Sequence, residues 1–165
     1  MNITEALDVI EQAISDPKVG LPEEIFKLIS RLTPMVNVDL LVKDTNQRTL
    51  LAWRDDEYSG TGWHIPGGIV RFKESLENRI QQVAISELKT EVRFNPNPIS
   101  LNQAFCNPDT RGHFISLLYK CTVNDDFQPD NTGTDEAEPG YLTWHNHCPD
   151  NLIQVHDMYR EYIAS

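Results

Sequence analysis

A pair of glycines followed by a helix-forming segment with internal glutamates constrains this chain more than any other feature. The segment starts at Pro66-Gly67-Gly68, reaches Glu74 after five further residues, and ends near Ser86-Glu87-Leu88. Adjacent glycines let a backbone approach a ligand more closely than side chains would allow. A following helix can present a carboxylate, and Mg²⁺ usually takes one or two protein carboxylates beside substrate phosphates. The segment therefore predicts a site for a divalent cation and a diphosphate.

The helix predicted over residues 75–91 has one apolar face that also contains a glutamate. Five apolar residues fall on this face at helical spacing, within about 140° of arc: Leu76, Ile80, Val83, Ala84 and Leu88. Glu87 lies inside the stripe, and a buried carboxylate needs a cation or hydrogen bonds to offset its lost hydration. Glu91 shares the face. The alternative is that both glutamates are solvated at the helix end.

The composition narrows the class of protein. At 165 residues the chain is long enough for one domain with a single core. A formal net charge of −11 argues against binding nucleic acid, which requires a surface rich in lysine and arginine. The first residues do not resemble a signal peptide, and no stretch approaches the roughly 20 apolar residues of a membrane span. We expect a cytoplasmic protein that binds neither nucleic acid nor membrane.

Hydrophobic periodicity predicts the order of the elements. Helical spacing is found in residues 3–16, 22–33, 75–91 and 150–163, and strand patterns in 36–42, 48–53, 63–65, 69–70, 100–106, 112–123 and 141–144. The polar turn over residues 43–47 predicts that the first two strands form a hairpin. Strands mixed with one central helix and terminal helices are typical of an α/β sandwich with a mixed sheet.

The segment from Gly68 onward resembles the box of a Nudix hydrolase, which runs glycine, five residues, glutamate, seven residues, then Arg-Glu-hydrophobic-x-Glu-Glu-x-Gly. Three box positions are kept, by Gly68, Glu74 and Glu87. The arginine, two glutamates and last glycine are replaced, by Gln82, Val83, Ser86 and Lys89. The resemblance implies a Nudix-type α/β/α sandwich with a mixed sheet over residues 34–165, and residues 1–33 form an additional N-terminal helical extension.

One branch of the family is more similar, namely the GDP-mannose mannosyl hydrolases, whose box can be reduced to a single metal-binding carboxylate on the helix. The similarity runs without a gap from about residue 21 to residue 88. In that branch a glycine carbonyl, the helix glutamate and a side chain of a late loop hold one Mg²⁺. The resemblance therefore implies that Gly67, Glu87 and Glu138 bind Mg²⁺.

The same resemblance assigns the other site residues. Arg54 matches an arginine that contacts the diphosphate, and Arg71 is expected to replace a second arginine that the branch has where this chain has Ile69. Substrate binding is assigned to Leu21, Phe26, Asp39, Arg54 and Arg71, and catalysis to Glu138, Arg54 and Glu74. Because the branch uses its N-terminal element across a dimer, a homodimer is implied. The branch's histidine base aligns with Pro139, so the base is left open among Glu138, His64, His113 and His145.

The implied activity is Mg²⁺-dependent hydrolysis of a nucleoside diphosphate sugar of the GDP-mannose or GDP-glucose type. Sugar and nucleoside diphosphate would be released by substitution at the anomeric carbon, because a single metal can neutralise the departing diphosphate. Two alternatives remain open. One is a diphosphatase that cleaves a P–O–P bond, with Glu91 or Glu138 recruiting further metal. The other is a catalytically weakened domain that binds nucleotide sugars.

Overall fold

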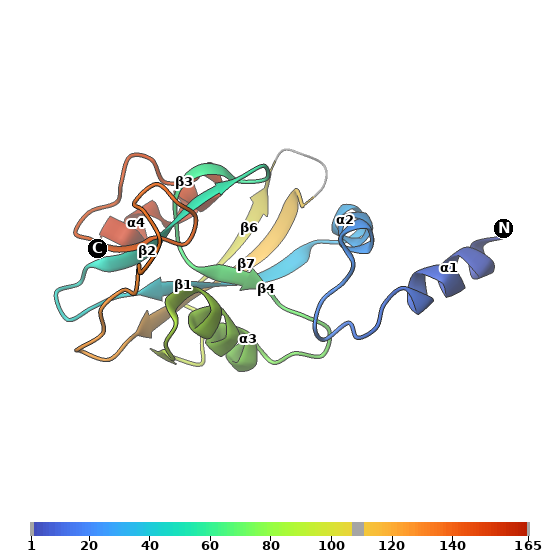
Figure 1. Cartoon of the computed structure of the whole chain (residues 1–165), viewed down its shortest axis with the longest axis horizontal. Coiled ribbons are helices and arrows are strands. Elements are labelled where there is room, and N and C mark those ends of the chain that lie inside the picture. Colours follow the sequence, from blue (N-terminus) through green and yellow to red (C-terminus); the bar gives the residue numbers. More distant parts are fainter. Residues whose placement is uncertain (1, 107–110, 165) are drawn as a thin grey trace.

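Two β-sheets and a set of short helices form the body of the molecule in a computed structural model that describes residues 2–106 and 111–164 (Figure 1). The larger sheet has the order β4-β1-β7-β5, with β6 also paired to β7. Its strands are β1 (Met35–Val42), β4 (Gly67–Ile69), β5 (Arg93–Phe94), β6 (Ser100–Phe105) and β7 (His113–Thr122). The pair β1–β7 is parallel and the others are antiparallel. The sheet is therefore mixed, which confirms the predicted α/β class.

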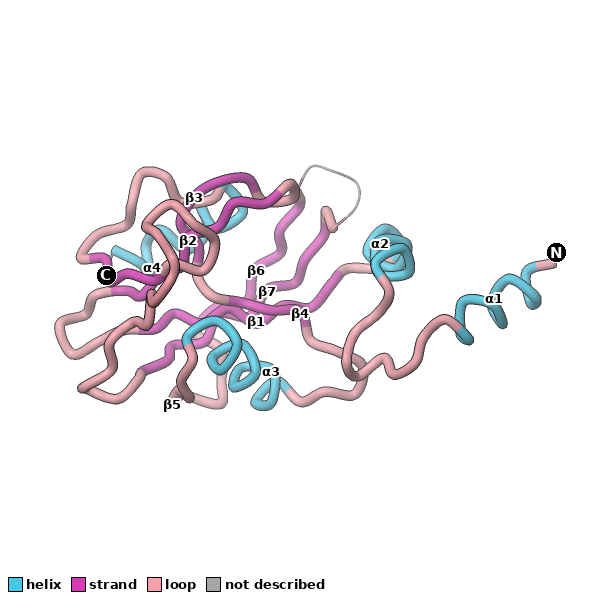
Figure 2. The backbone as a smooth tube through the Cα atoms, in the orientation of Figure 1, coloured by secondary structure: helices cyan, strands magenta, loops and turns pink. Residues whose placement is uncertain are grey.

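The smaller sheet is antiparallel and has the order β3-β2-β8. It consists of β2 (Thr49–Asp56), β3 (Gly60–His64) and β8 (Leu142–His145). The helices are α1 (Ile3–Gln12), α2 (Glu23–Leu32), α3 (Leu76–Val83), a π-helical turn η1 (Ala84–Leu88), a 3-10 helix η2 (Gln154–Tyr159) and α4 (Arg160–Ala164). Figure 2 shows how the helices and loops lie around the strands.

The two faces of β1 contribute to two different hydrophobic clusters. Val38, Leu40 and Val42 pack with α3 in one cluster. Leu41 packs in the other cluster, with residues of β2 and of the C-terminal helical segment. Since side chains alternate along a strand, Asp39 lies on the same face as Leu41. The strand thus directs one carboxylate toward the C-terminal segment, where it meets the Tyr159 hydroxyl.

The predicted hairpin of residues 36–42 and 48–53 is wrong. β1 pairs with β4 and β7, whereas β2 pairs with β3 and β8, and a single bridge between Lys43 and Thr49 joins the two strands. The reason lies in the burial of β1, which is a central strand covered on both faces. Such strands carry near-continuous apolar runs and take a partner on each side.

The two glycines belong to strand β4. Gly67 pairs with Asp39 of β1. A Cβ atom at Gly67 would lie 2.1 Å from Asp39 Oδ1 and 2.9 Å from the carbonyl oxygen of Val38. A Cβ at Gly68 would lie 2.8 Å from a methyl carbon of Val83 on α3. Glycine is required because both the neighbouring strand and the helix approach the backbone closely.

Several predicted helices are shorter than their hydrophobic patterns. The segment expected to be helical to residue 91 changes to a π-helical turn at Ala84 and ends after Leu88, with Lys89 in the left-handed conformation (φ 59°). In the segment expected to be helical over residues 150–163, the helical part begins only at residue 154, with a 3-10 helix over 154–159 and one short α-helix over 160–164. Apolar spacing cannot distinguish these backbones. The 3-10, α and π helices bond each residue to the one three, four or five positions away, so over one or two turns their apolar patterns are nearly the same.

The N-terminal helices differ in their contact with the body. α1 begins with a capping box at Asn2 but projects away from the body in Figure 1, and none of its ten residues is buried. Its apolar side chains Ile3, Leu7 and Val9 are exposed. α2, by contrast, buries Ser30. In the described part of the chain, no helix combines the length and the apolar character that crossing a membrane requires.

Candidate active site

A cavity of about 1010 Å³ lies between the larger sheet, the β2–β3 hairpin and the 3-10 helix η2. Among the residues that line it are six of the residues expected from the sequence: Leu21, Phe26, Asp39, Arg54, Gly67 and Arg71. Glu74, Glu87 and Glu138 are not part of this lining. Glu87 lies 3.4 Å from His64, which does line the cavity. The structure thus brings the whole predicted substrate-binding set to the cavity, whereas the three glutamates lie outside its lining.

Asp39 lies at the cavity with its carboxylate already engaged. It is 2% exposed. Its Oδ1 accepts a hydrogen bond from Asn37 Nδ2 at 2.6 Å, and its Oδ2 accepts one from the Tyr159 hydroxyl at 2.6 Å and another from the Ser116 hydroxyl. Burial raises the pKa of Asp39 to about 6, although the two hydroxyl donors oppose the shift. Asp39 is therefore held by three donors of the chain itself.

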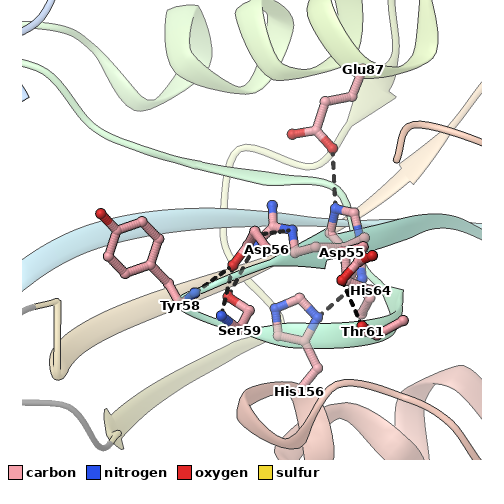
Figure 3. Close-up of polar contacts among 10 residues, drawn as sticks. Asp55, Asp56, Tyr58, Ser59, Thr61, His64, Glu87 and His156 are labelled. Atoms are coloured by element: carbon pink, nitrogen blue, oxygen red, sulfur yellow. Dashed lines mark hydrogen bonds and ion pairs between the residues drawn. The ribbon is translucent and has the colours of Figure 1, made fainter. Parts of the chain in front are cut away.

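Glu87 and His64 come from two different elements and point toward one another, as Figure 3 shows. Glu87 is on the π-helical turn η1 and its side chain is 27% exposed, while His64 ends β3 and is buried. The distance from Glu87 Oε2 to His64 Nε2 is 3.4 Å. Neither ring nitrogen of His64 has a hydrogen-bond partner among the described residues. Two potential cation ligands thus lie within ion-pair distance of each other without a hydrogen bond between them.

His156 is a site residue that the sequence did not predict. It is buried on η2 beside His64, with the ring centroids 6.2 Å apart, and it lines the cavity. Its Nδ1 accepts the backbone N–H of Ile65 at 3.0 Å, so the neutral ring carries its proton on Nε2. Burial, reinforced by the charges of His64 and Arg54, lowers the pKa of His156 well below its usual value. His156 is therefore a neutral hydrogen-bond donor. No sequence motif marks it.

Four arginines line this one cavity, although the chain has a net charge of −11. They are Arg54, Arg71, Arg79 and Arg111. The Arg54 Nε lies 3.4 Å from Asp56, and Arg71 donates to the carbonyl oxygen of Lys18 at 3.4 Å. Such a concentration of cations favours an anionic ligand, and guanidinium groups suit phosphate in particular.

Arg111 was not expected at the site, and it brings two aromatic rings to the cavity. Its guanidinium lies 4.5 Å from the ring centroid of Tyr58 and 5.5 Å from that of Phe26. Phe26 lies on α2 and Tyr58 in the β2–β3 turn, so three separate elements meet here. Nothing in the local sequence around these residues predicted their contact, because it depends on the path of the chain in space.

Glu74 holds Arg79 rather than facing the cavity. Its Oε2 accepts from Arg79 Nε and Nη2, each at 2.7 Å, and from the backbone N–H of Arg71 at 3.0 Å. The Arg71 backbone, Arg79 and Asn78 hold the pKa of Glu74 below its usual value, even though burial acts in the opposite direction. Arg79, three residues before Gln82 on α3, thus supplies the arginine partner of Glu74.

Glu138 lies away from this cavity. It is exposed in the loop before β8, and its Oε2 accepts the backbone N–H of Asp135 at 3.0 Å. Of the histidines considered as bases, His113 stacks on Phe105, and His145 contacts Trp63 in the smaller sheet. His64 alone among those three lines the cavity.

The residues at the site fit a single divalent cation. Among the described residues, no group of three or more His, Cys, Asp or Glu side chains is arranged to hold a metal. A smaller set suffices for a cation that keeps water and phosphate ligands, as Mg²⁺ does. The carboxylate of Glu87 and the backbone carbonyl of Gly67 have the required oxygen chemistry. A pair of metals held by several carboxylates does not fit this site.

We predict that Glu74→Ala acts mainly through stability. It would leave the Arg79 guanidinium buried without its partner, and we expect a loss of about 2 kcal/mol in the free energy of unfolding, since breaking a buried pair is costly. Urea denaturation measures this loss. Glu77→Ala, an exposed change on the same helix, is the matched control and should stay within about 0.5 kcal/mol. A stable Glu74→Ala variant with abolished turnover would instead make Glu74 catalytic.

Comparison with known proteins agrees with this geometry. The model of the NUDIX domain family matches residues 33–159. A curated relative, the low-salt glycan biosynthesis protein Agl8 of Haloferax volcanii, is 26% identical over 114 residues, which cover 67% of this chain and 72% of that protein.

Two solved structures are similar in fold. The MutT protein from Methanosarcina mazei Go1 has a TM-score of 0.61 at 16% sequence identity. The match covers 79% of this chain and 94% of the MutT chain. The MutT NUDIX hydrolase from Burkholderia pseudomallei has a TM-score of 0.63 at 18% sequence identity. This match covers 78% of this chain and 97% of the hydrolase chain. Because the family model spans most of the sequence and the same fold is observed, this chain belongs to the NUDIX domain family, as a Nudix hydrolase.

Proposed function

We propose that this Nudix hydrolase acts on a nucleoside diphosphate sugar, of the GDP-mannose or GDP-glucose type, with Mg²⁺ as cofactor. The products are free sugar and nucleoside diphosphate, formed by substitution at the anomeric carbon. The observation that carries the proposal is the single box carboxylate at the site. Glu87 faces His64 at the cavity, whereas Val83 and Ser86 occupy the positions of two other box glutamates.

A site with one metal-binding carboxylate favours breaking the bond between the sugar carbon and the diphosphate over attack of water on phosphorus. Attack of water on phosphorus is commonly supported by two metals that clamp the attacking and leaving oxygens, and this requires several carboxylates. A single Mg²⁺ held by Glu87 and the Gly67 carbonyl would supply positive charge to the diphosphate as it leaves. Among the described residues, no group of three or more His, Cys, Asp or Glu side chains is arranged to hold a metal, which supports one cation with few protein ligands over a pair of metals.

The chain's own residues would bind and orient the substrate. Arg54 and Arg71 offer guanidinium groups to the diphosphate, and fixed cations in a dry site stabilise developing charge. Phe26 and Leu21 offer apolar surface to the base. His156 presents a proton on Nε2 and can donate a hydrogen bond without changing its charge.

Water activation is assigned to Glu138, in keeping with the branch that the sequence resembles. Its exposed position outside the cavity means that the loop before β8 must move for Glu138 to reach either the water or the cation. The name of the Haloferax volcanii relative, a glycan biosynthesis protein, supports a substrate from sugar metabolism. Nucleotide sugars are the activated donors in glycan assembly, so the two lines of support agree.

Product analysis with a panel of nucleotide sugars tests the proposal. Incubation with Mg²⁺ and GDP-, UDP- or ADP-linked sugars should yield nucleoside diphosphate and free sugar. Glu87→Gln should lower the rate by at least about 10²-fold, if one cation stabilises the leaving group. Glu91→Gln, an exposed change just beyond η1, is the control and should keep the rate. Release of nucleoside monophosphate and sugar phosphate would identify a diphosphatase, and absence of any product would indicate a binding domain.

We also propose a homodimer that involves the N-terminal helices. The exposed apolar side chains of α1 support this, because a ten-residue helix is marginally stable in water without packing partners. Light scattering at micromolar concentration should give about twice the 18.9 kDa chain mass. Leu7→Glu should shift the mass toward the monomer, whereas Asp8→Asn, on the same helix, should not. A monomeric mass for the unmodified chain would refute the dimer.

A further inference from the structure

His64 has an unusual environment for a buried histidine. It is 4% exposed, yet neither Nδ1 nor Nε2 has a hydrogen-bond partner among the residues described. Buried polar side-chain atoms nearly always have a partner, and an exception in a native structure points to a missing water, ion or ligand. Because His64 lines the cavity and faces Glu87, the missing partner belongs to the active site.

The spacing of His64 and Glu87 is that of an ion pair without a hydrogen bond. The two side chains are 3.4 Å apart, and no hydrogen bond to Nε2 is formed by the residues described. A charge-assisted N–H···O bond would be shorter, at about 2.7–2.9 Å. Two ligand atoms about 2.1 Å from one cation lie about 3.0 Å apart at the octahedral angle that Mg²⁺ takes and about 3.4 Å apart at the tetrahedral angle that Zn²⁺ takes. A cation that lies off the line between Nε2 and Oε2 can therefore bind both atoms at a separation close to that observed.

The neighbouring histidine does not compete for this role. His156 uses Nδ1 to accept the Ile65 N–H at 3.0 Å, so its Nε2 keeps a proton and has no lone pair to offer in the neutral state. His64 has no such contact, and its neutral form can place the proton on Nδ1 and the lone pair on Nε2. Of the two adjacent rings, His64 alone can direct a lone pair toward Glu87.

We propose that His64 Nε2 is a second side-chain ligand of the cation bound by Glu87, and that the site therefore prefers Mn²⁺, Co²⁺ or Zn²⁺ over Mg²⁺. The inference rests on the proposed function only in taking Glu87 as the metal ligand. Imidazole nitrogen suits these transition metals, whereas Mg²⁺ strongly favours oxygen. One nitrogen ligand in an otherwise oxygen-rich site shifts the preference without excluding Mg²⁺.

Pulsed electron paramagnetic resonance of the full chain loaded with Mn²⁺ tests the ligand directly. The spectrum should show the hyperfine coupling of an imidazole ¹⁴N bound to Mn²⁺. The coupling should change to that of ¹⁵N when the protein is labelled at histidine alone. Bound Mn²⁺ without nitrogen coupling would overturn the proposal. This measurement needs no substitution, so it remains decisive even if variants of the buried His64 fold poorly.

Two variants identify which histidine gives the signal. His64→Gln should abolish the nitrogen coupling and weaken Mn²⁺ binding at least about 10-fold, the size of effect seen when a metal site loses a supporting group. Its Mg²⁺ affinity should change less than about 3-fold, since Mg²⁺ gains little from nitrogen. His113→Gln, remote in sequence and stacked on Phe105, is the control and should keep both. Retention of the coupling in His64→Gln would contradict the assignment.

Failure of this inference can be distinguished from failure of the proposed function. Metal binding that depends on Glu87 but shows no nitrogen coupling would remove His64 as a ligand and leave nucleotide-sugar hydrolysis untouched. A nitrogen-ligated Mn²⁺ in a chain that cleaves none of the nucleotide sugars would confirm the ligand and reject the proposed substrate. Isothermal titration with Mn²⁺, Zn²⁺ and Mg²⁺ separately supplies the order of preference.

Discussion

The approach of Gly67 to Asp39 is the contact on which the candidate site depends. With no Cβ at Gly67, β4 pairs with β1 so closely that a methyl group there would lie 2.1 Å from the Asp39 carboxylate. Gly68 in turn lets α3 pack against β4. The helix then continues into η1, which carries Glu87 to within 3.4 Å of His64 at the end of β3. Two missing side chains thus set the relative positions of a strand, a helix and two polar residues.

The second organising constraint is electrostatic. The chain is strongly acidic, yet four arginines line its cavity. One of them, Arg79, forms a salt bridge with Glu74, which lies outside the cavity lining. Guanidinium groups in such a setting attract a phosphate-bearing ligand locally, although the protein as a whole would repel a polyanion such as nucleic acid. The two carboxylates near the cavity already have contacts within the chain. Asp39 accepts hydrogen bonds from three donors, and Glu87 faces His64.

Sequence reasoning recovered the local features and missed those that depend on distant contacts. The α/β class and the helix after the glycines followed from apolar spacing and composition, whereas Glu87, expected inside the apolar stripe, is partly exposed. The hairpin of residues 36–42 and 48–53 was wrong, because strand pairing is decided by burial of β1 on both faces rather than by the intervening turn. The π-helical turn at Ala84–Leu88 could not be predicted either, since an apolar stripe does not show which residues are joined by backbone hydrogen bonds.

Site residues divide in the same way. Gly67 and Arg54 could be named because they lie in or near a recognisable segment, and both line the cavity. His156 and Arg111 could not, because each reaches the cavity from an element whose place in space no local pattern encodes. Glu138 was assigned by likeness to one branch and lies outside the lining, which leaves its role as a prediction.

The central claim is that one cation at Glu87 serves departure of a nucleoside diphosphate from carbon. Hydrolysis of a GDP-linked sugar in ¹⁸O-enriched water, followed by mass spectrometry of both products, tests this claim most directly. The account predicts ¹⁸O in the released sugar and none in the nucleoside diphosphate. Incorporation of ¹⁸O into a phosphate group would contradict it, because water would then have attacked phosphorus.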